Sequence, residues 1–231
     1  MSIAENIAQV RTNIAQACAH AGRSPEEITL VCDSKKNYAA ACREAIAAGI
    51  DALGENRVQE MTAKLADNAY DGAPLHFIGH LQRNKVKQVV GKVALIQSVG
   101  SMELLEEIEK VAAREQLVQD ILLEVNIGRE EAKSGFDPDA VTAAAEAALS
   151  LPHVRVRGLM TIPPADADRD ANMRYFQEVQ ALYVDINTKL FHNELKCLSM
   201  GMSGDYMDAI RCGATMVRVG TAIFGARNYN I

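Results

Sequence analysis

The chain has 231 residues, of which 48% are hydrophobic and 23% are charged, as in an ordinary soluble globular protein with a sizeable core. Its formal net charge of −6 excludes the basic field that a nucleic-acid or anionic-lipid partner would need. No apolar run approaches the roughly 18–20 residues that span a bilayer, and residues 1–22 predict an amphipathic helix, not a signal peptide. The five cysteines are scattered without a C-x-x-C pair, which predicts buried thiols in a reducing cytoplasm and no disulfide or metal site.

After this helix the chain alternates between strand-like and helical segments. Ser24 and Glu27 form a capping box around Pro25, which predicts a brief turn before the first strand. Apolar, β-branched runs of strand length then follow at 28–35, 51–56, 74–80, 94–99, 118–127, 154–162, 197–200 and 216–225.

Periodic apolar positions between these runs predict helices, most clearly over 102–116 and 172–190. Asp137 as a cap and Pro138 at the first helical position predict the start of another helix. The polar segment 163–171 predicts a long loop.

Strands that alternate with helices imply βαβ units and a parallel sheet. Eight such units predict an α/β fold, a closed (β/α)₈ TIM barrel with an extra N-terminal helix, as a single domain over residues 1–231. A doubly wound open sheet is the alternative, because strand count alone does not prove closure.

The active site of a (β/α)₈ barrel lies at the carboxyl ends of its strands. The side chains expected there are mostly polar: Lys35, Asn56, His80, Ser98, Asn126, Met160 with Thr161, Ser199 with Met200, and Arg218 through Thr221. One lysine, one arginine, amides and hydroxyls predict a site for a small anionic ligand.

Two adjacent lysines follow the first strand. Side chains on a strand alternate between faces, so Val31, Asp33 and Lys35 share one face. If that face looks into the barrel, Lys35 is the inward lysine, and a partly desolvated amine there attacks a carbonyl to form a Schiff base. The alternative is a lysine that stays in solvent without a role, which suits Lys36.

Two glycine-bearing segments predict a phosphate site. The segment SMGMSGD, 199–205, leads from a short strand into a helix, and Gly220 and Thr221 end the last strand. Backbone N–H groups at such places bind phosphate, and the loops after strands 7 and 8 recur as phosphate sites in this fold.

His80 and Glu55 have two interpretations each. As a catalytic base, His80 would need an orienting partner that the sequence does not identify, so a histidine hydrogen-bonded in the barrel mouth is favoured. Glu55 belongs to a carboxylate–amide cluster in which Asn56 binds a ligand hydroxyl, or it pairs with a neighbouring lysine. From these residues alone, the chain is a barrel that binds a phosphorylated carbonyl compound.

Together, the segments resemble the pyridoxal phosphate homeostasis proteins. The resemblance rests on SK after the first strand, GENRVQE, HFIGHLQRNK, SVGSMEL, VNIGREEAKSGF, RGLMTIPP, LSMGMSGDYMDAI and GATMVRVGTAIFG, in this order along nearly the whole chain. It implies a barrel of the alanine racemase N-terminal type that binds pyridoxal 5′-phosphate (PLP) as a lysine aldimine. The first functional hypothesis is a carrier or buffer of PLP that supplies apo PLP-dependent enzymes and has no substantial catalytic reaction. We expect it to be a monomer, and the cysteines predict a cytoplasmic location.

The same resemblance implies a set of PLP contacts. Lys35 would form the aldimine, Asn56 would lie near the ring hydroxyl, and Arg218 would face the pyridine nitrogen. An arginine keeps its proton, so the nitrogen would stay unprotonated and the ring would be a weak electron sink. The residues implied around the phosphate are Ser199, Met200, Ser203, Gly220 and Thr221.

The chain departs from the family after the first strand, where V-S-K-T-K-P is typical and this sequence reads DSKKNY. An inward Asp33 would favour the ammonium form of Lys35 and oppose aldimine formation, unless Lys36 shields Asp33 by pairing with it.

Two other functions fit parts of the pattern. A PLP-dependent amino-acid racemase would need a second, mostly β domain, yet only ARNYNI follows the last strand. A Schiff-base aldolase would use Lys35 directly on a sugar phosphate, and its phosphate site would look the same. The full-length resemblance favours the carrier over both.

Overall fold

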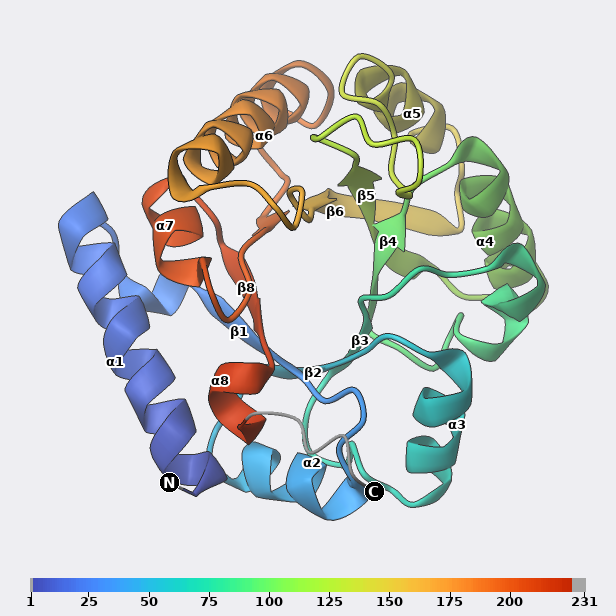
Figure 1. Cartoon of the computed structure of the whole chain (residues 1–231). Coiled ribbons are helices and arrows are strands. Elements are labelled where there is room, and N and C mark those ends of the chain that lie inside the picture. The colour runs from blue at the N-terminus through green and yellow to red at the C-terminus, as the bar shows by residue number, and fades with distance from the viewer. Residues whose placement is uncertain (1, 226–231) are drawn as a thin grey trace.

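The computed structural model describes residues 2–225, and the strands in this range close into one parallel barrel (Figure 1). The strands follow the chain order around the barrel, and β1 pairs with both β2 and β8. The predicted closed barrel is therefore confirmed, and the open sheet is not formed. The strands are β1 (Thr29–Asp33), β2 (Ala52–Glu55), β3 (Leu75–Phe77), β4 (Leu95–Val99), β5 (Gln119–Val125), β6 (Val154–Thr161), β7 (Cys197–Ser199) and β8 (Met216–Val219).

Helices surround the barrel as an outer ring (Figure 1). They are α1 (Ile3–Ala21), α2 (Ala39–Ala47), α3 (Val58–Ala66), α4 (Met102–Arg114), α5 (Val141–Ala148), α6 (Arg169–Leu190), α7 (Tyr206–Arg211) and α8 (Thr221–Phe224). Two 3₁₀ turns complete the set, η1 (Pro25–Glu27) at the predicted capping box and η2 (Arg83–Gln88) after β3. No helix within residues 2–225 is long and apolar enough to cross a membrane.

The extra N-terminal helix α1 is present as predicted and packs against the last elements of the chain. Ile7, Val10 and Ile14 bury its apolar face. The Asn6 Nδ2 atom donates a hydrogen bond to the carbonyl oxygen of Ile223 in α8 at 2.7 Å. Because α8 follows β8 directly, α1 packs next to the carboxyl end of the last strand.

The barrel interior has an apolar layer below a polar one. Val31, Ala52, Leu95, Leu122, Met160 and Met216 fill the apolar layer. Because strand side chains alternate, the residues two positions further along face the same interior. Those positions hold Asp33, Gln97, Glu124 and Arg218. A layer of polar and charged side chains therefore lies above the apolar layer, at the carboxyl ends of the strands.

Three predicted elements differ from the structure. Helix α6 begins at Arg169, so the last three residues of the predicted loop 163–171 are helical. The run 216–225 is a strand only over Met216–Val219, and it continues as α8, whose Ile223 is fully buried. A short apolar run suits a strand or a buried helix equally well. The predicted helix start at Asp137 and Pro138 is too early, because α5 begins at Val141. The Asp137 carboxylate accepts the Asp139 N–H at 2.9 Å, and a turn over residues 137–140 leads into the helix.

Candidate functional site

Arg218 is the central charged group of the polar layer. Its side chain is buried, with Nη1 2.5 Å from the Ser199 hydroxyl and Nη2 2.9 Å from the Thr161 carbonyl oxygen. Burial lowers the pKa of Arg218 to about 10, and the nearby carboxylates of Asp205, Glu124 and Asp33 oppose that fall. The guanidinium therefore stays charged at neutral pH and is held in one orientation.

A chain of hydrogen bonds runs from Arg218 down into the barrel. The Ser199 hydroxyl accepts from Arg218 and donates to Gln97 Oε1 at 2.6 Å. Gln97 Nε2 donates in turn to Nδ1 of His76 at 3.0 Å. Burial lowers the pKa of His76 to about 4, so the ring is neutral and accepts this bond. Strand periodicity places Gln97 inside, but it does not predict the chain of bonds.

Glu124 is a buried acid that the sequence reasoning missed. Its Oε2 atom has no hydrogen-bond partner among the described residues. Burial raises the pKa of Glu124, and the Ser134 hydroxyl, Arg218 and His80 oppose the rise. The inward position two residues after Leu122 is the signal that would have identified it.

Lys35 lies at the barrel mouth beside Asp33, as the strand alternation predicts. Its Nζ atom is 3.0 Å from Asp33 Oδ2, and the two side chains are 29% and 15% exposed. Gly220 also packs against Asp33, where an added Cβ would lie 3.1 Å from the Asp33 carbonyl oxygen. The end of β8 therefore approaches the Lys35–Asp33 pair closely.

The turn that carries Lys35 rests on a buried ionic cluster below it. Glu55 Oε1 accepts from the Ser34 hydroxyl at 2.6 Å, Lys64 Nζ at 2.5 Å and the Tyr70 hydroxyl at 3.0 Å. Lys64 Nζ also lies 2.9 Å from Glu60 Oε1, one helical turn earlier on α3. The prediction that Glu55 pairs with a neighbouring lysine is confirmed. The sequence did not show which lysine, because Lys64 lies nine residues away on α3.

The residues predicted around a phosphate divide into two groups. The Ser203 hydroxyl accepts the N–H groups of Gly220 at 3.1 Å and Ala222 at 3.3 Å, so the loop after β7 meets the start of α8 beside the exposed Thr221. Ser199 instead points at Arg218, and Met200 packs in the core. Ser203, Gly220 and Thr221 therefore bring backbone and hydroxyl groups together in one place. The phosphate role of all five residues stays a prediction.

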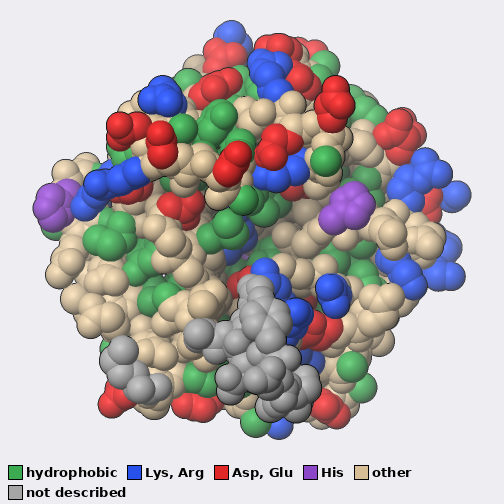
Figure 2. Space-filling model, viewed as in Figure 1, with side chains coloured by type: hydrophobic (Ala, Val, Ile, Leu, Met, Phe, Trp, Pro, Cys, Tyr) green, Lys and Arg blue, Asp and Glu red, His purple; other side chains and the backbone are tan. Residues whose placement is uncertain are grey.

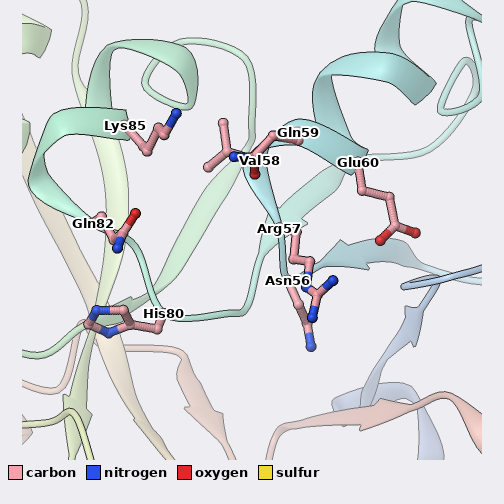
Figure 3. Close-up of a pocket in the computed structure, with 8 residues that line it drawn as sticks. All are labelled: Asn56, Arg57, Val58, Gln59, Glu60, His80, Gln82 and Lys85. Atoms are coloured by element: carbon pink, nitrogen blue, oxygen red, sulfur yellow. The ribbon is translucent and has the colours of Figure 1, made fainter.

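Asn56 opens onto a cavity of about 610 Å³ between the segment after β2 and the segment after β3 (Figure 3). His80 and Gln82 lie on one side of it, and Asn56 and Arg57 project from the other. The full lining is Asn56, Arg57, Val58, Gln59, Glu60, His80, Gln82 and Lys85. The Asn56 Oδ1 atom is buried and has no hydrogen-bond partner among residues 2–225, so its capacity to accept a hydrogen bond is unused there.

His80 does not make the hydrogen bond expected of it. Its side chain is exposed, and no group within residues 2–225 bonds to its ring. Figure 2 shows that Lys and Arg side chains gather near this side of the molecule, over η2. Residues 72–102 contain Arg83, Lys85, Lys87 and Lys92 but no acidic residue, which makes this side locally basic in an acidic protein.

A family model, curated relatives and solved structures all match this chain, and the three comparisons agree. The alanine racemase N-terminal domain matches residues 6–228. A pyridoxal phosphate homeostasis protein of Aquifex aeolicus is 41% identical over 229 residues, which cover 99% of this chain and 100% of the relative. The structure of PipY from Synechococcus elongatus with PLP bound has a TM-score of 0.85 and 33% identity, and the match covers 97% of this chain and 100% of PipY.

An alanine racemase of Clostridium difficile has the same fold at a greater distance. Its TM-score is 0.73 at 16% identity, and the match covers 95% of this chain but 56% of the racemase. At this identity the similarity concerns the barrel alone.

Proposed function

Because the chain belongs to the alanine racemase N-terminal domain family and, within it, to the pyridoxal phosphate homeostasis proteins, we propose that it binds PLP through Lys35 and acts in PLP homeostasis. In this proposal it is a carrier or buffer that holds a reactive aldehyde and releases it to apo PLP-dependent enzymes. The PLP in the structure of the relative PipY supports the choice of ligand.

One observation carries the proposal: Asp33 at the end of β1 lies near both Lys35, whose Nζ is 3.0 Å from its carboxylate, and Arg218 on the neighbouring strand β8. In the register of β1 and β8, Arg218 lies beside Val31, four residues before Lys35 on the chain. PLP supplies an aldehyde that condenses with a lysine amine. Lys35 would hold that end, Arg218 would donate to the pyridine nitrogen, and Asn56 Oδ1, which has no partner in the described part of the chain, would accept from the ring hydroxyl.

The same geometry favours holding PLP over transforming it. Arg218 is charged and fixed by Ser199 and the Thr161 carbonyl, so it would donate a hydrogen bond to the ring nitrogen of PLP without giving up a proton. A nitrogen that is not protonated withdraws few electrons from the reacting carbon. We propose on this ground that the protein has no substantial reaction of its own.

We further propose that the barrel acts as a single cytoplasmic domain and as a monomer. All five cysteines are free thiols, as in a reducing compartment. The closed barrel leaves no open sheet edge for a second copy to extend. The large exposed apolar side chains are dispersed along the chain: Tyr38, Val118, Leu149, Val184 and Met202.

Adding PLP to the purified protein and reducing it with borohydride tests the proposal. We expect a visible absorbance band, and after reduction a covalent PLP adduct on the peptide that contains Lys35. Lys35→Ala should abolish both, while Lys36→Ala should keep both. An adduct on another lysine, or no adduct in the wild type, would contradict the proposed site.

Replacing Asp33 tests the cost of its ion pair with Lys35. Asp33→Val should raise PLP affinity by about two- to fivefold, because a partly exposed ion pair of roughly 0.5–1 kcal/mol no longer has to be broken. Titration of PLP by absorbance measures the change. Asp71→Val removes the same charge from an exposed turn before β3 and serves as the control. Unchanged or lower affinity in Asp33→Val would show that Asp33 does not oppose binding.

A further inference from the structure

We propose that Glu60 and Lys64 of α3 are positioning residues, which hold the turn that carries Lys35 and thereby fix the direction of its amine. The geometry of this contact is independent of any ligand. Its consequence for PLP rests on the proposed function.

Both peptide groups that flank Lys35 are bound by side chains of α3. On one side, the Ser34 carbonyl oxygen accepts from Lys64 Nζ at 2.7 Å. On the other side, the Lys36 N–H donates to Glu60 Oε1. Lys64 and Glu60 are one helical turn apart and are themselves paired at 2.9 Å, so they face the turn together. The backbone on either side of Lys35 is therefore clamped to one helix.

The clamp is anchored in the protein interior. Lys64 Nζ lies 2.5 Å from Glu55 Oε1, and the two side chains are 8% and 0% exposed. Burial alone would lower the pKa of Lys64, but its hydrogen bonds and ion pairs with Glu55 and Glu60 raise it, so the ammonium keeps its charge. An ammonium has three donor hydrogens, and Lys64 uses them on Glu55, Glu60 and the Ser34 carbonyl.

The turn needs such support because its own conformation is unfavourable. Lys36 has a φ of 61°, in the left-handed region that residues other than glycine rarely adopt. Two hydrogen bonds join residues of the turn, from the Asn37 N–H to the Ser34 carbonyl at 3.1 Å and from the Asn37 amide to the Lys35 carbonyl at 3.1 Å. A strained segment of this kind persists where its surroundings determine it, and α3 supplies two of those contacts.

The helix also links Lys35 to the cavity of Figure 3. Helix α3 begins at Val58, two residues after Asn56, and Glu60 lines the cavity from its first turn. The proposed contact to the ring hydroxyl therefore lies just before the helix that clamps the backbone on either side of Lys35. Asn56 and Lys35 keep a fixed relation before any ligand arrives, which is how a site avoids an ordering cost on binding.

Glu60→Gln tests the clamp without disturbing the buried pair, since the Glu60 side chain is 21% exposed and Glu55 still holds Lys64. Hydrogen exchange of the apo protein is the first measurement. We expect the peptide that covers residues 34–37 to exchange about tenfold faster or more, because the Lys36 N–H loses an ionised acceptor. PLP dissociation, followed by absorbance, should accelerate by a similar factor.

Asp185→Asn is the matched control, because Asp185 forms an exposed pair with Lys189 one turn apart on α6, 2.7 Å between Nζ and Oδ1. It should change neither measurement. The double variant Glu55→Gln/Lys64→Met removes both buried charges and should show the same local acceleration as Glu60→Gln.

A merely structural role would lower the melting temperature of these variants and leave local exchange and PLP dissociation as in the wild type, and that result would overturn the proposal. Exchange does not involve PLP. Faster exchange in a protein that binds no PLP would therefore support the clamp and reject the proposed function, so the two failures are distinguishable.

Discussion

Replacing Lys64 by methionine is expected to lower the free energy of unfolding by about 3–5 kcal/mol, the usual cost of removing one partner of a buried ion pair. The methionine fills a similar volume but leaves the Glu55 carboxylate without its cation, in a place that solvent does not reach. Two hydroxyl donors, from Ser34 and Tyr70, remain. They do not neutralise the charge, so the carboxylate must take up a proton or draw in water.

Urea unfolding at neutral pH measures this loss. The double variant Glu55→Gln/Lys64→Met should recover a large part of it, because a neutral amide replaces the stranded charge. Lys189→Met breaks an exposed pair and should change the free energy of unfolding by no more than about 0.5–1 kcal/mol. An equal loss of unfolding free energy in Lys64→Met and Lys189→Met would show that burial of the Lys64 pair does not affect stability.

Replacing Gly79 by alanine is expected to weaken PLP binding by about tenfold or more, because a shifted ligand contact loses a buried hydrogen bond. An added Cβ would lie 2.3 Å from the Asn56 carbonyl oxygen and 2.6 Å from its Cα. Neither atom is the mobile end of a side chain, so the backbone of Asn56 must move. That movement displaces the amide proposed to accept from the ring hydroxyl.

Absorbance titration with PLP and a thermal melt together separate this effect from unfolding. Gly204→Ala provides the control for stability, since no atom lies within 4 Å of its added Cβ and its φ is not left-handed. The melting temperature of Gly204→Ala should match that of the wild type. Wild-type PLP affinity in Gly79→Ala would exclude Asn56 from the contact set.

The barrel was predictable because its signal is repeated. Eight apolar runs with helical patterns between them specify a parallel sheet, and the structure closes it. The ends of elements were less predictable. After Asp137 a turn precedes the helix, which begins only at Val141, and after Val219 an apolar run changes from strand to helix because Ile223 packs into the core. Such competition between local bonds and packing is settled only in three dimensions.

The site was predictable where chemistry follows strand periodicity. Alternation along β1 was enough to put Asp33 and Lys35 on one face, and the ion pair between them confirms it. Contacts between distant segments had no such signal. Gln97 and Ser199 are 102 residues apart in the chain, and Glu60 contacts the Lys36 N–H across 24 residues. No periodicity within one segment encodes such a pair.

The packing of α1 against α8 has a consequence for how the protein folds during its synthesis on the ribosome. The bond from Asn6 to Ile223 joins residues 217 positions apart, and β1 needs β8 as a neighbour. At a translation rate of about 5–20 residues per second, the partners of the first helix and strand emerge roughly 10–40 seconds after them. Throughout that interval the nascent chain presents Ile7, Val10 and Ile14 and one unpaired strand edge to its surroundings. Chaperones that protect nascent chains are therefore expected to engage its first thirty or so residues.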